Sequence, residues 1–111
     1  MSDTLQDLSR RLERFAAQRD WGRFHSPKNL ASALIVEAAE LLEHFQWMTE
    51  AQSRALAPEQ RDAVAAEMAD VLLYLLHLGN QLGIDLLDAA RAKMQINEKR
   101  FPVAPEPKQP E

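Results

Sequence analysis

Apolar residues recur at intervals of three and four along most of this chain, and this spacing constrains its fold more than any other feature. Such intervals place apolar side chains on one face of an α-helix, whereas the alternation that marks a strand is scarce here. Only 3 glycines interrupt the 111 residues. Short connections between the helices favour a helical hairpin or four-helix bundle. The pattern therefore predicts an all-α chain with four helices, over about residues 3–18, 27–48, 58–82 and 86–100.

Residues typical of helix ends mark the boundaries of these segments. Ser26 and Pro27 form an N-cap followed by a proline at the first helical position. Gly83 ends the third segment, and a proline ends the fourth. The last ten residues contain four prolines, which neither a helix nor a central strand accepts. We therefore predict one domain over residues 1–101 and a disordered, proline-rich tail over residues 102–111.

The composition excludes several classes of protein. The chain has no cysteine, so it holds neither a disulfide framework nor a zinc site with cysteine ligands. Its 13 Lys and Arg against 17 Asp and Glu give a net charge of −4, which argues against binding to nucleic-acid polymers. Its longest apolar run, from Val71 to Leu76, is far shorter than the roughly 20 residues that span a membrane. The N-terminus carries no apolar signal region, and we expect a cytoplasmic protein without a membrane partner.

Two pairs of carboxylates interrupt the apolar faces of the second and third predicted helices. On the second helix, Glu37 lies in the middle of the apolar stripe and Glu40 lies at its edge. Glu67 and Asp70 repeat this arrangement on the third helix. An ionised carboxylate in an apolar stripe must be paired, protonated or bound to a metal, because its desolvation is costly. Neither helix carries a Lys or Arg on its own stripe within reach of these acids.

A hairpin would bring the two pairs face to face, so that four acids converge. Two carboxylates about 4 Å apart repel by roughly 4 kcal/mol at an effective dielectric constant of about 20. Such a cluster suits a divalent cation, and oxygen ligands without a Glu-x-x-His motif favour Mg²⁺ or Mn²⁺ over a di-iron centre. Three interpretations stay open at this point: a divalent-metal site that binds phosphate, a structural acid cluster, and separate surface acids.

The four acids and their context resemble a known family. Glu37 and Glu40 form an E-x-x-E motif. After a spacer of 26 residues, Glu67 and Asp70 follow as E-x-x-D. The flanking segments RDWGRFHSPKNLA, EHFQW, EMADVLLYLL and KMQINEKRFP are similar to those of the dCTP pyrophosphatase branch of the MazG-like all-α nucleoside triphosphate pyrophosphohydrolases. The resemblance covers about residues 5–103.

This resemblance implies a MazG-like four-helix fold and Mg²⁺-dependent hydrolysis of a nucleoside triphosphate, such as dCTP or a modified dCTP, between its α- and β-phosphates. The products are a nucleoside monophosphate and pyrophosphate, and such an enzyme cleans the nucleotide pool. A homo-oligomer, a tetramer of two dimers with sites near subunit interfaces, is also implied. The resemblance assigns the catalytic metal ligands, with Mn²⁺ as an alternative ion, to Glu37, Glu40, Glu67 and Asp70.

Substrate contacts are expected from aromatic, polar and basic residues outside the acid motifs. The resemblance places nucleotide contacts at positions matching residues 21–25, Trp47 and Tyr74, and aromatic rings can stack on a base. His25 or Asn29 can hydrogen-bond a pyrimidine, and basic residues can meet the triphosphate charge. Each residue also has a structural interpretation, as part of the core, a helix cap or a solvated surface. The full set of expected contacts is Trp21, Phe24, His25, Lys28, Asn29, Trp47, Tyr74, Lys93, Asn97 and Arg100.

Two positions depart from the pattern of the family. Leu12 stands where some relatives carry a nucleotide-contacting histidine, which leaves the base preference open. Phe101 stands where relatives often have a tyrosine, so a hydroxyl is missing. The alternative function is a non-catalytic helical oligomer whose carboxylate cluster is structural or binds a metal without turnover.

Overall fold

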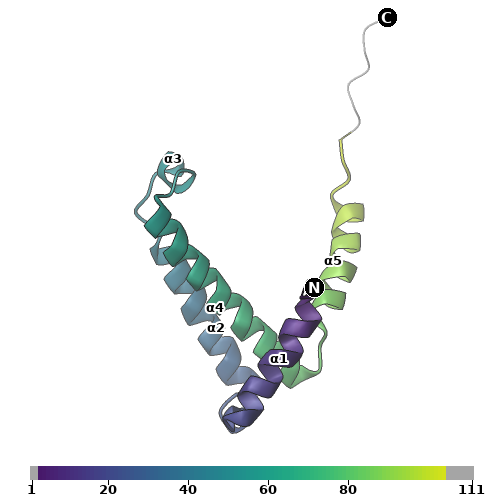
Figure 1. Ribbon diagram of the computed structural model, residues 1–111. Helices are drawn as coiled ribbons and strands as arrows, with labels where there is room; N and C mark the ends of the chain where they lie inside the picture. The colour runs from purple at the N-terminus through teal and green to yellow at the C-terminus, as the bar shows by residue number, and fades with distance from the viewer. Residues whose placement is uncertain (1–2, 105–111) are drawn as a thin grey trace, which may run out of the picture.

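The computed structural model describes residues 3–104, which form four long helices, a short helix and one 3-10 turn (Figure 1). No strand occurs within the described residues, and the predicted all-α fold class is confirmed. In chain order, the elements are α1 (Leu5–Gln18), η1 (Trp21–Arg23), α2 (Pro27–Glu43), α3 (Glu50–Ser53), α4 (Pro58–Leu82) and α5 (Leu86–Arg100).

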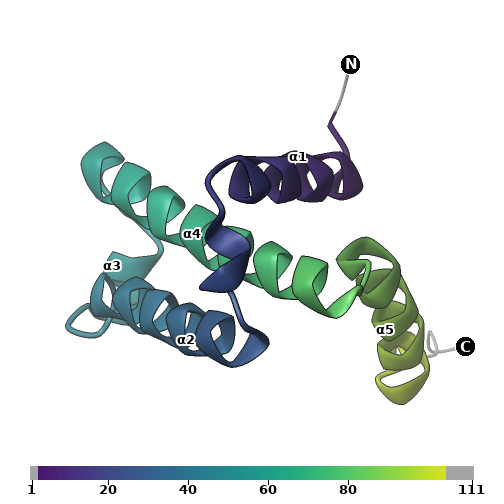
Figure 2. The same ribbon diagram turned by 90° about the horizontal axis from the view of Figure 1, so that it is seen from below.

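Helices α2 and α4 lie side by side and form a hairpin (Figures 1 and 2). The short α3 lies in the connection at one end of this hairpin. The buried apolar residues of the described part are Leu30 on α2 and Val64 and Leu76 on α4. Burial of one such side chain contributes about 1.5–3 kcal/mol. The predicted hairpin core is therefore confirmed, and it determines which residues of α2 and α4 face each other.

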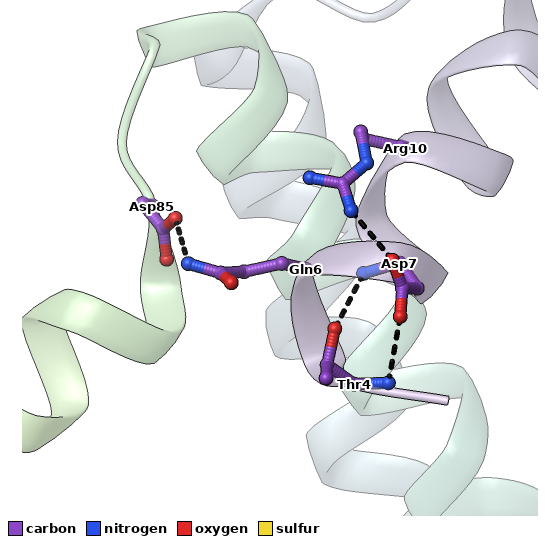
Figure 3. Close-up of polar contacts among 5 residues, drawn as sticks. All are labelled: Thr4, Gln6, Asp7, Arg10 and Asp85. Atoms are coloured by element: carbon purple, nitrogen blue, oxygen red, sulfur yellow. Dashed lines mark hydrogen bonds and ion pairs between the residues drawn. The ribbon is translucent and has the colours of Figure 1, made fainter. Parts of the chain in front are cut away.

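Helix α1 lies against α4 at the end of the hairpin opposite α3 (Figure 1). It begins with a capping box, in which the backbone N–H of Asp7 donates to the Thr4 hydroxyl and the Thr4 N–H donates to the Asp7 carboxylate (Figure 3). The side chain of Gln6 donates a 2.6 Å hydrogen bond to the carboxylate of Asp85, the N-cap of α5. The start of α1 is thereby tied to the turn between α4 and α5.

A reciprocal polar contact and a close backbone approach complete this junction. The Ser9 hydroxyl donates to the side-chain carbonyl of Asn80 at 2.7 Å, and the Asn80 amide donates back to the Ser9 carbonyl at 3.1 Å. Gly79 is buried where a Cβ would lie 3.0 Å from the carbonyl oxygen of Ile84. Gly83 ends α4 with a φ of 66°, in the left-handed region that favours glycine. These residues fix α1 on α4 and turn the chain into α5.

Helix α5 leaves this junction and projects away from the α2–α4 hairpin (Figure 1). It contacts α1, and most of its side chains are exposed. In the single chain, α2 and α4 therefore form a hairpin, and α1 and α5 are attached at one end of it. At the start of α5 the side chain of Leu86 lies close to Gly79 of α4, whereas Met94 and Ile96 further along the helix are exposed.

The helix boundaries agree with the predicted ones except at the end of α2. This helix ends at Glu43 instead of near Met48. Thr49 caps α3 by accepting a hydrogen bond from the backbone N–H of Gln52, and this cap needs extended backbone at Thr49, where ψ is 164°. Residues 44–47 therefore tighten into turns before the cap. The prediction that residues 44–48 continue α2 was wrong, because the Thr-x-x-Gln capping signal begins a new helix.

The end of the chain was predicted to be a proline-rich tail. Residues 102–104 follow α5 without helical structure. The rest of that tail, residues 105–111, lies outside the described residues, so the domain boundary at residue 101 stays a prediction. Across residues 3–104, none of the helices combines the length and the apolar character that crossing a membrane requires.

Candidate functional site

Three acidic side chains meet between α2 and α4. Glu37 comes from α2, and Glu67 and Asp70 come from α4. Each contributes a carboxylate oxygen, and these oxygens all lie within 4.8 Å of one another. Glu37 and Glu67 are half-buried, and Asp70 is exposed. The hairpin thus brings these three predicted acids together.

Glu40, the fourth predicted acid, lies one turn beyond Glu37 on α2 and is also half-buried. Burial, together with the neighbouring carboxylates of Glu67 and Glu40, raises the pKa of Glu37 to about 7. Glu40 therefore adds negative charge to the cluster, although it lies outside the closest set of three. We refer to Glu37, Glu40, Glu67 and Asp70 as the carboxylate cluster.

Two oxygens of the carboxylate cluster have no hydrogen-bond partner. Within residues 3–104, Oε2 of Glu37 and Oε2 of Glu67 are both sealed from solvent and accept no hydrogen bond. The ion pairs found within residues 3–104 involve other acids, which are exposed. A buried carboxylate oxygen without a partner is costly unless another group neutralises it. Because divalent cations such as Mg²⁺ prefer hard oxygen ligands, the cluster fits such a cation better than it fits an ion-paired structural role.

A cavity of about 460 Å³ opens beside the carboxylate cluster, between α1, η1 and α4. Asp70 belongs to the cluster and also lines this cavity, so the two form one continuous site. Three of the predicted substrate contacts, Trp21, His25 and Tyr74, line the cavity as well. The full lining is Leu8, Arg11, Leu12, Phe15, Trp21, His25, Asp70, Leu73, Tyr74 and His77.

Aromatic rings lie close to one another along the cavity wall. Trp21 meets Phe15 edge-on at a centroid distance of 5.3 Å and lies 5.7 Å from the ring of His25. The ring of His77 lies 4.7 Å from that of His25 and 6.2 Å from that of Tyr74. Trp21 keeps 37% of its surface exposed. Rings with free surface in a largely apolar cavity suit a planar ligand that can stack.

The segment between α1 and α2 places Trp21 and His25 in the cavity. Asp20 adopts a left-handed conformation with a φ of 52° and precedes η1. Ser26 then caps α2 by accepting a hydrogen bond from the backbone N–H of Asn29. The side chain of Asn29 donates to the carbonyl of Phe24 at 3.1 Å. Asn29 therefore holds this segment in shape and, unlike His25, does not line the cavity.

Two further predicted contacts from this segment also lie outside the cavity lining. Phe24 is exposed, and the guanidinium of Arg23 lies 4.8 Å from its ring centre. Lys28 is exposed in the first turn of α2. Neither side chain is brought to the cavity within this chain.

The remaining four predicted contacts belong to other elements. Trp47 follows the end of α2 and is 89% exposed. Lys93, Asn97 and Arg100 lie on α5, which contacts α1, and none of them lines the cavity. The single chain therefore does not bring these four residues together with Trp21, His25 and Tyr74.

Several lining residues were not predicted as site residues. Leu8, Leu12 and Phe15 form the apolar stripe of α1, which is indistinguishable in sequence from a stripe that packs into a core. Arg11 lies among them as the basic residue of the lining. His77 follows Asp70 by two helical turns on α4, and this spacing was the one signal that could have placed it in the cavity.

The fold and the carboxylate cluster together indicate the class of all-α proteins to which this chain belongs. The sequence profile of the MazG-like family matches residues 33–109 of this chain, which therefore belongs to that family. The predicted family membership is confirmed.

Individual relatives extend this finding. The chain is 44% identical to human (Homo sapiens) dCTP pyrophosphatase 1 over 101 residues, covering 89% of this chain and 59% of the relative. It is 45% identical to the mouse (Mus musculus) protein of the same name over 102 residues, covering 90% and 60%. The chain thus spans about 60% of the length of these curated relatives. A crystal structure of a pyrophosphatase from Archaeoglobus fulgidus DSM 4304 superimposes with a TM-score of 0.82 at 36% identity, covering 93% of this chain and 96% of that one.

Proposed function

We propose that this chain is a Mg²⁺-dependent nucleoside triphosphate pyrophosphohydrolase that acts on dCTP or a modified dCTP. The observation that carries this proposal is the pair of sealed, unpartnered oxygens of Glu37 and Glu67 beside a cavity lined with aromatic rings. The names of its relatives support the proposal, since two are dCTP pyrophosphatases and the archaeal structure is a pyrophosphatase. Removal of unwanted nucleotides from the pool is the role that such an activity would serve.

The carboxylate cluster would hold the cation through Glu37, Glu40, Glu67 and Asp70, with Mn²⁺ as an alternative to Mg²⁺. When bound, the cation supplies positive charge for the triphosphate and lowers the pKa of a coordinated water. The raised pKa of Glu37 supports this role. A positive charge among these acids would cancel the repulsion that contributes to the raised pKa.

The residues of the chain would bind and orient the substrate along the continuous site. Asp70 lies where the cluster meets the cavity, so the phosphates belong beside the cluster and the base belongs in the cavity. Trp21 offers ring surface for stacking, and Arg11 adds positive charge to the lining.

The reaction breaks the bond between the α- and β-phosphates. A water oxygen forms a new bond to phosphorus, a carboxylate of the cluster accepts the proton that the water loses, and pyrophosphate leaves with the electron pair of the broken bond. Little covalent chemistry is asked of the protein, because phosphoryl transfer depends mainly on positioning and charge stabilisation.

We also propose that the enzyme is a homo-oligomer, a tetramer of two dimers. Exposed apolar faces on helices often mark protein interfaces, and a second copy of the chain supplies a matching face. In such an assembly Trp47 and the α5 face formed by Lys93, Asn97 and Arg100 reach the cavity of a neighbouring copy. The exposed apolar side chains include Ile35, Val36 and Leu42 on α2, Met68 and Leu72 on α4, and Met94 and Ile96 on α5.

Pyrophosphate release from a panel of dCTP, a modified dCTP, dUTP and dTTP, with and without Mg²⁺, tests the activity. We expect release that requires Mg²⁺ or Mn²⁺ and is fastest with dCTP or its modified form. If the pure, folded protein cleaves no nucleotide with either ion, the enzyme proposal fails and the non-catalytic metal-binding oligomer takes its place.

Subunit mixing tests whether neighbouring copies share a site. Glu67→Gln and Arg100→Ala variants, each weakly active alone, are unfolded, mixed and refolded together. Recovered activity in the mixture is expected, because some mixed sites combine an intact cluster with an intact Arg100. If the mixture shows only the average of the two variants, each site is complete within one chain.

A further inference from the structure

His77 is a buried polar residue to which the proposed reaction gives no task. It is 8% exposed, and no other polar or charged residue in the described part of the chain is buried. His77 lines the 460 Å³ cavity and also a smaller cavity of about 140 Å³. Buried polar groups normally have hydrogen-bond partners, so an unpartnered imidazole at this place needs an explanation.

No hydrogen bond to the ring nitrogens of His77 is present within residues 3–104, in contrast to Asn80 one turn further along α4. In this part of the chain, the side-chain polar atoms that lack both a partner and access to solvent belong to Glu37 and Glu67, and not to His77. The ring nitrogens of His77 are therefore accessible through the cavities that His77 lines. Its nearest ring neighbour is His25, at 4.7 Å in an edge-to-face arrangement.

The chemical state of His77 suits hydrogen bonding to a neutral ligand. Burial, together with the nearby His25, lowers the pKa of His77 below its ordinary value. The imidazole is therefore neutral at physiological pH and carries one N–H donor and one nitrogen acceptor. A neutral ring of this kind complements the polar edge of a base better than it complements a phosphate.

The order of residues along α4 indicates which part of a nucleotide His77 would meet. Asp70, Tyr74 and His77 all line the same cavity and follow one another toward the C-terminal end of the helix. Asp70 and His77 are separated by a helical rise of about 10 Å. A nucleotide whose phosphates lie at Asp70 would extend its sugar past Tyr74 and its base toward His77.

We propose that His77 hydrogen-bonds the polar edge of the substrate base and thereby determines which base the enzyme prefers. This inference rests on the proposed function, because it takes the cavity to be the nucleotide site. Trp21 and His25 would contribute ring surface on one side of the base, while His77 would supply the directional contact. A purely packing role for His77 is the alternative that the test must exclude.

Steady-state kinetics of His77→Phe with dCTP, dUTP and dTTP provide the first test. Phenylalanine keeps an aromatic ring beside His25 but offers no hydrogen bond to any base. We expect KM for the preferred nucleotide to rise about tenfold and the preference over the other bases to shrink by a similar factor, with a smaller change in kcat. His77→Gln, which restores a donor and an acceptor, should recover part of the preference.

Gln81→Ala is the matched control, because Gln81 lies one turn further along α4 and borders the small cavity but not the large one. Its KM and base preference should equal those of the wild type. A folded His77→Phe variant with unchanged KM and base preference would overturn the proposal and leave His77 as a packing residue.

A binding experiment on the wild-type protein separates failure of this inference from failure of the proposed function. The probe is a dCTP analogue with a methylene group between the α- and β-phosphates, added with Mg²⁺ while the histidine ring nitrogens are followed by NMR. A shift of the His77 nitrogens on binding is expected even if the protein hydrolyses no nucleotide. Binding that leaves the His77 nitrogens unshifted contradicts the inference, whatever the activity.

Discussion

The carboxylate cluster and the adjacent cavity are two halves of one site that are built in different ways. The cluster comes from two helices of one hairpin, each of which contributes a pair of acids three residues apart. The cavity is assembled from α1, η1 and α4, which are brought together by packing and by polar contacts at the α1–α4 junction. Unpartnered oxygens dominate the first half, whereas rings and aliphatic side chains dominate the second.

This difference separates the chemistry of the site from its recognition of a ligand. A carboxylate can lose its charge while the hairpin keeps its packing, because the cluster adds repulsion to the fold. A ring or a contact of α1 can be removed while the acids stay in place. Variants can therefore be chosen that damage one half and spare the other, and their effects should fall in a definite order.

The largest effect is expected for Glu67→Gln in the cluster. The variant keeps the size of the side chain but loses a negative ligand, so kcat should fall by at least about 100-fold. Without metal, its melting temperature should match or exceed that of the wild type, because repulsion from Glu37 is relieved. Pyrophosphate release and thermal melts in chelator measure the two quantities.

Glu59→Gln is the matched control for this variant, since Glu59 is an exposed acid on the same helix. Its turnover should equal that of the wild type. A large loss of metal-free stability in Glu67→Gln would contradict the separation and make Glu67 a structural partner of the hairpin.

A smaller effect, confined to substrate affinity, is expected for Trp21→Ala in the cavity. Loss of a stacking ring should raise KM by roughly 5- to 150-fold, with cation affinity of the cluster unchanged.

Trp47→Ala should raise KM only in the assembled oligomer, because Trp47 does not line the cavity of its own chain. Kinetics over a dilution series, together with the measured oligomeric state, distinguish the two tryptophans. An unchanged KM in Trp21→Ala would place the base elsewhere.

Ser9→Ala should loosen the packing of α1, which forms one wall of the cavity, against α4. The variant leaves the side-chain carbonyl of Asn80 without its donor, so the free energy of unfolding should fall by about 1–2 kcal/mol. A less firmly held α1 should also raise KM a few-fold, while Mn²⁺ binding by the cluster stays unchanged. Denaturant unfolding, kinetics and metal titration measure these three quantities.

Ser32→Ala is the control for this contact, because Ser32 donates to a backbone carbonyl of its own helix at an exposed position. Its stability and KM should stay close to those of the wild type. If Ser9→Ala weakened Mn²⁺ binding as much as it raised KM, the two halves of the site would not be separable.

The carboxylate cluster could be predicted from sequence because the position of each acid pair on its helix depends on local helix geometry. Positions three residues apart share a helix face, and a hairpin of two such helices leaves few other arrangements for Glu37 and Glu67. The start and end of α4 were predicted for the same reason, from Pro58 and Gly83. The spacing within each acid pair and the ends of α4 depend on interactions within a few residues along the chain.

The cavity could be predicted only in part because its walls depend on contacts distant in sequence. The apolar stripe of α1 gives no sign of whether Leu12 and Phe15 face a core or a cavity. Trp47 was predicted to lie on α2, but α2 ends at Glu43 and the chain turns before the cap at Thr49, so Trp47 lies beyond the end of the helix. Whether Lys93, Asn97 and Arg100 reach a cavity depends on where α5 packs in an assembly, and the fold of the single chain does not determine this.

The smallest effect is a dependence of metal-free stability on pH. The pKa of Glu37 is raised from 4.5 to about 7 in the folded protein, so the folded state binds more protons than the unfolded state between these values. Protonation of Glu37 therefore favours folding fully below about pH 4.5, and this contribution is lost as the pH rises through 7. In chelator, the wild type should lose stability relative to Glu37→Gln over this interval, and saturating Mg²⁺ should protect the wild type more than the variant. Denaturant midpoints of the two proteins across the interval measure the difference. Parallel pH profiles of the two proteins would mean that repulsion among the carboxylates of the cluster does not oppose folding. The cluster would then resemble the cavity in its effect on stability, contrary to what the sealed oxygens of Glu37 and Glu67 indicate.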